Sequence, residues 1–312
     1  MKHLLLLLAL AGLLSLGSAI AAINSPQPVT FQYLLESNEC LGCKLEGVSI
    51  QGLNLNFSQL EGANLQKVHG KGTNFEGANC SNTQWQKSKL MYADFRTANL
   101  INASMENADL MLANLQGANL RGAKFESANL QGAKFEAAQI SYGNFQNANL
   151  AYANLEGANL ANTDFTNSNL KAAILTGVNL QGANLQGADL QKANLQGANL
   201  QGTNLKLTNL KQANLSDTYL GGAILEQTNL ENAFLERACF AANECTLKTV
   251  SVRSFPRETT TIRSVNFQGT DLRGTSFAGI EQENISWETM ELCNTILPNG
   301  VVSDRDCANS FY

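Results

Sequence analysis

The chain has 312 residues, of which 15% are charged and 44% are hydrophobic, and its formal net charge is −5. This length suits one large domain or two ordinary ones. The low charge content and the mild net charge are not typical of a disordered chain or of a nucleic-acid-binding protein.

The first predicted element is a leader, residues 1–21. One lysine precedes a leucine-rich run, and Ala19 and Ala21 then form the A-x-A arrangement of a cleavage site. This order is typical of a secretory signal peptide cut between Ala21 and Ala22. The alternative is an uncleaved membrane anchor, although the apolar run is short for a membrane span. No later apolar run is long enough to cross a bilayer, so we expect an exported protein without stable membrane insertion after cleavage.

Residues 22–44 are predicted to form an N-terminal cap. The segment TFQYLLESN within them is expected to form a short helix with Thr30 as its N-cap. Its apolar face would consist of Phe31, Leu34 and Leu35. A repeat array needs such a cover because its ends otherwise expose core and backbone.

Six of the seven cysteines lie in close pairs at the ends of the repeats or beyond them. Export makes disulfides possible, although spacing does not prove their connectivity. The expected disulfides are Cys40–Cys43, Cys239–Cys245 and Cys293–Cys307. For the Cys40-x-x-Cys43 pair, a zinc site and a labile redox pair are the alternatives.

A five-residue period occupies residues 45–240. A large apolar residue, the centre of each unit, recurs every five residues without a slip, and a small residue, mostly Ala, stands two places before it. This period fits neither the 3.6 residues of a helix nor the two of a flat strand. Gly or Asn often stands two places after the centre, where each tolerates the positive φ of a turn. Each unit therefore predicts a very short strand and a corner, and four corners close a square coil.

Stacked coils of this kind would pair in parallel about 4.8 Å apart and form a solenoid. The units, such as ANLQGANL, resemble the A-(D/N)-L-x-x signature of pentapeptide repeat proteins, and the resemblance covers residues 45–240. It implies an all-β fold, a right-handed quadrilateral parallel β-helix, of about 10 to 11 coils here. The flanking segments LLESNECLGCKLEG and CNTILPNGVVSDRDC resemble those of exported cyanobacterial members. That likeness implies the periplasm or the thylakoid lumen, with the extracellular space as a further possibility.

The centres should fill the inside of the rod, and Phe125, Phe145 and Phe165 should stack there. Gly70 is the one missing centre, and Trp85 on the next coil is a candidate to fill the space that it leaves. Cys80 is itself a centre, so we interpret it as a small buried hydrophobic residue and not as a nucleophile.

Beyond the repeats, we expect a loop at 241–259, an extra repeat coil at 260–280 and a C-terminal cap at 281–312. The turn signal LPNG predicts a hairpin in the cap, closed by the Cys293–Cys307 disulfide. The protein is expected to be a monomer or a homodimer through this cap. Three outward positions near this end are apolar, and the loop or tail is predicted to cover some of them: Tyr219, Ile224 and Phe234.

The sequence gives no support for catalysis. Apart from His3 in the leader, His69 is the only histidine, and it should point outward and alone. The glycines are periodic corners without the lysine of a phosphate-binding loop, and the carboxylates are scattered over a rod with no pocket. We therefore expect no catalytic, cofactor-binding or metal-binding residues.

The sequence predicts instead a structural or protein-interaction rod with an unknown protein partner. Most outward positions are polar, but one group of apolar residues is predicted to form an exposed patch, as partner sites do. The predicted patch consists of Met91, Tyr92, Ile101, Met111 and Leu112. Ordinary scattered surface residues are the alternative interpretation.

The family resemblance implies one alternative function, because some members mimic DNA and bind DNA gyrase. Mimicry requires a strongly acidic rod, since duplex DNA carries one charge per roughly 1.7 Å. Residues 41–240 contain 15 acidic and 14 basic residues, so their net charge is close to zero. This charge and the leader both disfavour gyrase binding, and we expect no nucleic-acid partner.

Overall fold

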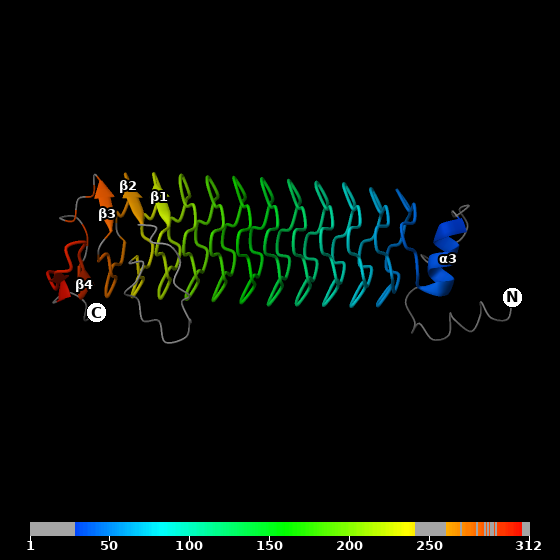
Figure 1. Cartoon of the computed structure of the whole chain (residues 1–312), viewed down its shortest axis with the longest axis horizontal. Helices are drawn as coiled ribbons and strands as arrows, with labels where there is room; N and C mark the ends of the chain where they lie inside the picture. The colour runs from blue at the N-terminus through cyan, green and yellow to red at the C-terminus, as the bar shows by residue number, and fades with distance from the viewer. Residues whose placement is uncertain are drawn as a thin grey trace.

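The computed structural model describes residues 29–240, 260–268, 270–278, 280–283, 285, 287, 290 and 292–307. The predicted leader (1–21) and the predicted loop (241–259) lie outside these residues. Figure 1 shows a straight rod with helix α3 at one end and the short strands β1 to β4 toward the other. No helix in the described part is long and apolar enough to cross a membrane.

Each turn of the rod contains 20 residues. Parallel bridges join positions 20 residues apart, as from Asn99 to Asn119 and on to Gln139, and we call each such set of positions a column. The backbone N–H of Leu100 donates to Asn119 O at 2.7 Å, and that of Asn102 donates to Arg121 O at 3.0 Å. The five-residue period thus satisfies its backbone polar groups on the neighbouring coils, as the sequence predicts.

The corners have the backbone conformation that the sequence predicts. The residue two places after each centre has a positive φ, for instance +66° at Gly182 and +56° at Asn102. A hydrogen bond closes the turn: Ala103 N–H donates to Leu100 O at 3.0 Å. Larger residues also occupy this position, among them Tyr92 at φ +59°.

Apolar centres and small residues fill the interior of the rod. The predicted phenylalanine stack is confirmed, with ring centroids 4.7 Å apart for Phe125–Phe145 and 5.0 Å apart for Phe145–Phe165. At Gly70, the three atoms nearest to the position of a Cβ belong to Leu90 and Ile50, at 2.9 to 3.3 Å. The neighbours in its own column therefore close in on the missing centre, and a contribution from Trp85 stays a prediction.

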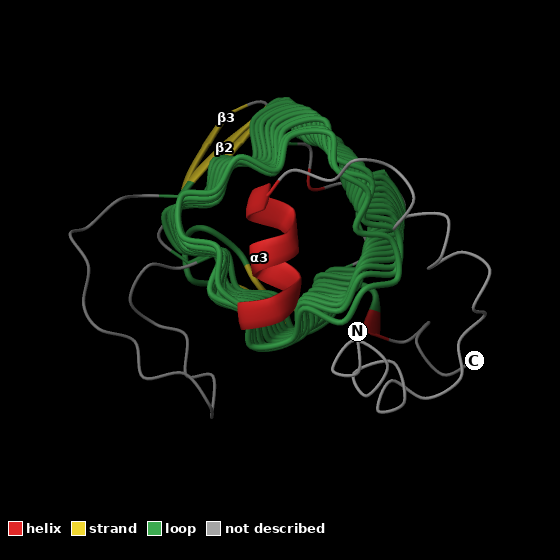
Figure 2. Cartoon of the chain, turned by 90° about the vertical axis from the view of Figure 1, so that its right-hand side faces the viewer, coloured by secondary structure: helices red, strands yellow, loops and turns green. Residues whose placement is uncertain are grey.

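Helix α3, Val29–Ser37, lies across the end of the first coil (Figure 2). Phe31 and Leu34 are buried against the core. Leu35 is 44% exposed, so its predicted place on the buried face is wrong. The helix turns by about 100° per residue, and only a narrow stripe meets the coil below. Thr30 lies inside the helix and not at its N-cap.

The stack continues beyond Phe240 with a change of register. Strands β1 (Ile224–Glu226), β2 (Thr261–Arg263) and β3 (Glu281–Glu283) form a parallel sheet in that order. Ile224 of β1 pairs with Thr261 of β2, whereas Thr261 pairs with Glu281 at the usual 20-residue interval. The extra residues between β1 and β2 leave the pairing pattern of the coils intact.

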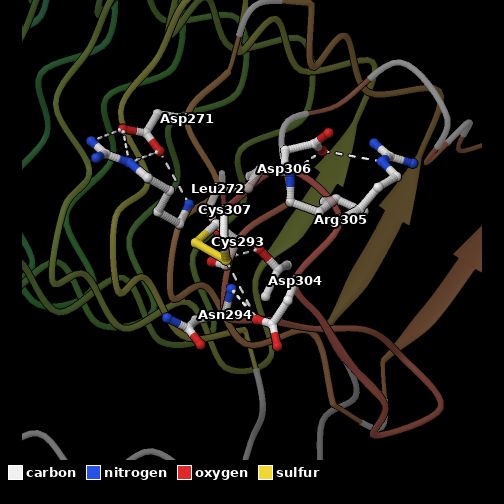
Figure 3. Close-up of a disulfide and its surroundings, with 11 residues drawn as sticks. Asp271, Leu272, Cys293, Asn294, Asp304, Arg305, Asp306 and Cys307 are labelled. Atoms are coloured by element: carbon white, nitrogen blue, oxygen red, sulfur yellow. Dashed lines mark hydrogen bonds and ion pairs between the residues drawn. A yellow bond between two sulfur atoms is a disulfide. The ribbon is translucent and has the colours of Figure 1, made fainter. Parts of the chain in front are cut away.

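An antiparallel pair ends the rod. Strands β4 (Thr295–Ile296) and β5 (Val302–Ser303) pair with each other, and Ile296 also bridges Ser276 of the coil beneath. The disulfide Cys293–Cys307 closes this unit (Figure 3). Beside the disulfide, Asp306 accepts a hydrogen bond from Leu292 N–H at 2.8 Å and Asp304 accepts one from Asn294 N–H at 3.1 Å.

Of the three outward apolar residues near this end, only Tyr219 is buried, at 3% exposure. Ile224 is 39% exposed and Phe234 is 52% exposed. Only Tyr219 is therefore shielded from solvent, and the other two remain in contact with it.

Candidate functional site

Most of the outer surface is built from hydrogen-bonded polar ladders. In the column of Asp109, Asn129 Nδ2 donates to Asp109 Oδ1 at 2.9 Å, and Asn149 Nδ2 donates to Asn129 Oδ1 at 3.2 Å. Asn169 continues the ladder with a bond of 3.0 Å to Asn149 Oδ1. These polar atoms are occupied in holding adjacent coils together, so the ladders support the fold and do not form a binding site.

One corner of the rod departs from this polar surface. Tyr92, Leu112 and Tyr152 share a column and are 50%, 45% and 60% exposed. Met91 and Met111 lie half-buried beside them, and Tyr92 N–H donates to Met111 O at 3.0 Å in the ladder that joins the two coils. We call these five residues the ridge.

The fold does not need large side chains at this corner. Tyr92, Leu112 and Tyr152 have φ values of +59°, +58° and +62°, a conformation that costs a non-glycine residue about 1–2 kcal/mol. Gly132 lies between Leu112 and Tyr152 in the same column, and Leu112 Cδ2 lies 2.7 Å from the position of a Cβ there. Leu112 therefore leans along the corner over a glycine that leaves room for it.

Ile101 lies far from the other residues of the predicted patch. It lies ten residues after Met91, which is half of a 20-residue coil. Its backbone O accepts from Asn82 N–H, and the neighbouring Asn102 N–H donates to Arg121 O. Ile101 therefore lies at the diagonally opposite corner, so its predicted place beside Met91 and Met111 is wrong.

The ridge forms one edge of the most basic face of the rod. This face consists of residues 47–52 and the equivalent six residues of each later coil through 227–232, and we call it the lysine face. It carries seven lysines and three acidic residues, whereas the rest of residues 41–240 carries seven basic and twelve acidic residues. The near-neutral rod therefore has one positively charged side.

Most of this charge lies on two adjacent coils. The stretches 67–72 and 87–92 contain four lysines and His69 but no acidic residue. Lys67 pairs with Glu46 at 2.7 Å, and Lys71 Nζ lies 5.7 Å from the ring centroid of Tyr92. Lys87 and Lys89 are exposed and form no ion pair within the described residues. Lys71 thus connects the lysine face to the ridge.

The remaining reactive groups are isolated. His69 is exposed, and burial raises the pKa of the Cys80 thiol far above its usual range, so this cysteine stays protonated. Cys40 and Cys43 are bonded to each other, which leaves no thiolate for zinc. Within the described residues, no group of three or more His, Cys, Asp or Glu side chains could hold a metal ion. Cys245 lies outside those residues, so the Cys239–Cys245 disulfide stays a prediction.

The surroundings of the Glu126 carboxyl disfavour its ionised form. Burial raises the pKa of Glu126, and the Glu106 carboxyl one coil away raises it further, against a backbone hydrogen bond and Lys124, which lower it. Asn144 Nδ2 donates to Glu126 Oε1 at 2.6 Å, while Oε2 is buried without a hydrogen-bond partner. By itself, a half-buried carboxyl does not make a catalytic site.

The comparison with family profiles covers most of the rod. The profile described as "Pentapeptide repeats" matches residues 54–84, 144–182, 173–212 and 208–241, and the one described as "Pentapeptide repeat region" matches 81–155. Together the matches run without a gap from residue 54 to residue 241, which is more than half of the chain. A search of curated proteins finds no significant match.

Solved structures of other repeat proteins are similar to the chain at low sequence identity. HetL from the cyanobacterium Nostoc sp. strain PCC 7120, a pentapeptide repeat protein involved in heterocyst differentiation regulation, is 24% identical, with 88% of this chain and 97% of that chain covered and a TM-score of 0.39. QnrB1, a plasmid-mediated fluoroquinolone resistance protein, is 15% identical, with coverage of 64% and 89% and a TM-score of 0.41. A pentapeptide repeat protein from the Arabidopsis thaliana thylakoid lumen is 23% identical, with coverage of 41% and 67% and a TM-score of 0.12.

The five-residue period, the 20-residue coil and the profile matches agree. They identify the fold as the right-handed β-helix solenoid of this family, and the chain belongs to the pentapeptide repeat proteins.

Proposed function

We propose that the protein is a non-catalytic structural or interaction rod that works in an exported compartment. The observation that carries this proposal is the filled interior: apolar side chains occupy the inside of the described coils, so only the outer surface is available to a partner. The predicted leader and the disulfides Cys40–Cys43 and Cys293–Cys307 support export, because disulfides persist in oxidising compartments.

The ridge is the surface through which this rod would contact its partner. Tyr92, Leu112 and Tyr152 are exposed, and they occupy corner positions that glycine or asparagine fills at many other corners at lower cost. A contiguous exposed apolar group of this kind marks an interaction site.

The ridge can be tested with charged substitutions that the coil already accommodates. Lys71 and Lys171 occupy the same column as Met91 and Met111, so Met91→Lys with Met111→Lys should fold normally. The exported wild-type protein should sediment with a partner after gentle extraction, and the double variant should not. Ile101→Lys, at the opposite corner, is the matched control and should behave as wild type. Equal sedimentation of all three proteins would contradict a role for the ridge.

Export has its own test, the N-terminus of the protein recovered from its native host. We expect a chain that begins at Ala22 and lies outside the cytoplasm. A cytoplasmic protein with an intact N-terminus would contradict this part of the proposal.

The alternative, a DNA mimic that binds gyrase, is disfavoured by charge. The near-neutral coils and the lysine face do not present the acidic surface that mimicry requires. The protein should leave gyrase supercoiling activity unchanged, and inhibition would reverse this ranking.

A further inference from the structure

We infer that the ridge and the lysine face dock together on the surface of a lipid bilayer with anionic headgroups. The inference rests on the proposed function, because it names the class of partner for the surface proposed there. It concerns binding to the surface of the membrane and not insertion across it.

Charge favours this class of partner. The two stretches 67–72 and 87–92 place four lysines and His69 on adjacent coils, about 4.8 Å apart, with no acidic residue among them. Lys71, Lys87 and Lys89 are exposed and form no ion pair within the described part of the chain, so their charges are available to an outside partner. An anionic membrane surface attracts a cluster of this size.

The shape of the ridge also favours a membrane. Its exposed side chains stand at the outer edge of a corner, which is convex, and they form a line parallel to the rod axis. A peptide with apolar anchors is usually bound in a groove. A straight convex edge beside a flat face instead fits a planar surface into which apolar side chains can enter.

The chemistry of the side chains agrees with charge and shape. Tyrosine suits the boundary between headgroups and acyl chains because its ring is apolar and its hydroxyl is polar. Tyr92 lies next to Leu112 in the ridge column, Tyr152 follows beyond Gly132, and Lys71 lies against the Tyr92 ring. Long lysine side chains can hold their charge at the headgroups while their stems follow the apolar edge. Interfacial apolar residues beside basic ones are the combination that binds anionic membrane surfaces.

The test uses flotation of the exported protein with phosphatidylcholine vesicles, with and without phosphatidylglycerol. The wild type should float with the phosphatidylglycerol vesicles at low salt, and added salt should weaken binding because it screens exposed charges. Lys71→Gln with Lys87→Gln and Lys89→Gln should weaken binding about fivefold per lysine. The matched triple variant Lys44→Gln, Lys124→Gln and Lys134→Gln removes exposed lysines from other faces and should retain more of the binding.

The ridge is tested separately from the charge. Tyr92→Asn with Leu112→Asn should reduce flotation at low salt, because it removes the apolar contacts and leaves every lysine in place. Asparagine already occupies corners with positive φ, as at Asn102 and Asn107, so this variant should fold. Tyr142→Asn is the matched control at the opposite corner, where the tyrosine is 64% exposed, and it should float as the wild type does.

Absence of wild-type flotation at low salt would overturn the inference, and so would equal losses in the two lysine triple variants. If vesicles are not bound but Met91→Lys with Met111→Lys still loses a native partner, the proposed function stands and the partner is a protein. If the wild type does not bind vesicles, and Met91→Lys with Met111→Lys retains every partner of the wild type, both proposals are wrong.

Discussion

Asn149 shows how one outward residue contributes to the rod. Its Nδ2 donates to Asn129, and its Oδ1 accepts from Ala151 N–H at 3.3 Å and from Asn169 Nδ2 at 3.0 Å. The asparagine before the centre therefore fixes its own corner and both neighbouring coils. Its frequency in the sequence reflects support of the fold, and recognition depends on positions where other residue types replace the regular ones.

Glu126 is a residue that the fold tolerates at a cost. Because burial and Glu106 raise its pKa, the folded chain binds a proton here more tightly than the unfolded chain does. Its contribution to stability therefore falls as pH rises through the folded pKa. Glu126→Gln should raise the melting temperature at neutral pH by about 1–2 °C, allowing for solvent screening of a partly exposed group. Gln86 and Gln146 occupy the same column, so glutamine fits.

The gain in melting temperature from Glu126→Gln should disappear when the pH is below the ordinary glutamate pKa, because the carboxyl is then protonated in both the folded and the unfolded chain. Melting curves at acidic and neutral pH measure this difference, with Glu156→Gln at an exposed site as the control. A gain that persists at acidic pH would contradict the electrostatic explanation.

Corner glycines differ in how much space a side chain would have at each of them. Gly77 and Gly157 have the same φ, +65°, but the Phe57 ring approaches within 2.5 Å of the position of a Cβ on Gly77, whereas nothing lies within 4 Å of that on Gly157. Gly157→Ala should lower the free energy of unfolding by about 1 kcal/mol because of its positive φ. Gly77→Ala should cost more, because the ring must also move. Equal losses in chemical denaturation would show that the ring adapts freely.

At the scale of elements, the repeating coil is predictable from sequence and its ends are less so. The period specifies which residues face inward, and the turn at each corner follows from the position of Gly and Asn. The exposure of Leu35 depends on how α3 lies across the coil, which helix periodicity alone does not determine. Closure around Gly70 likewise depends on how Ile50 and Leu90 orient. The position of Ile101, by contrast, follows from counting residues around a 20-residue coil.

Removal of the Cys293–Cys307 disulfide should destabilise the C-terminal cap without destabilising the middle of the rod. The Cys293–Cys307 disulfide closes a loop with a sequence separation of 14, and chain entropy for a loop of this length is worth about 3 kcal/mol. Cys293→Ala with Cys307→Ala should therefore speed amide exchange in residues 292–307. Central coils should be unaffected, because each coil contacts only its neighbours.

The Cys40–Cys43 pair offers a comparison, since its sequence separation of 3 constrains the unfolded chain less. Its double alanine variant should have a smaller effect on amide exchange near its own site. Faster exchange throughout the rod in the Cys293–Cys307 variant would show that the coils unfold as one unit.

At the scale of the whole molecule, the rod has one side that differs from the others in both charge and hydrophobicity. The charge total of the repeats conceals this difference, because seven lysines on one face are balanced by acidic residues elsewhere. Sorting the charges by column would have revealed the lysine face from the sequence. The half-buried setting of Glu126 and the leaning of Leu112 over Gly132 required the packed coils.

The most direct test of a docking surface on this rod is the reactivity of surface lysines in the native compartment. Acetylation of intact cells and of the purified exported protein, compared by mass spectrometry, reports which lysines a partner covers, whatever its class. We predict that Lys71, Lys87 and Lys89 are protected in cells relative to Lys124 and Lys134. Equal labelling of the two groups in cells would contradict a docking surface on the lysine face and the ridge.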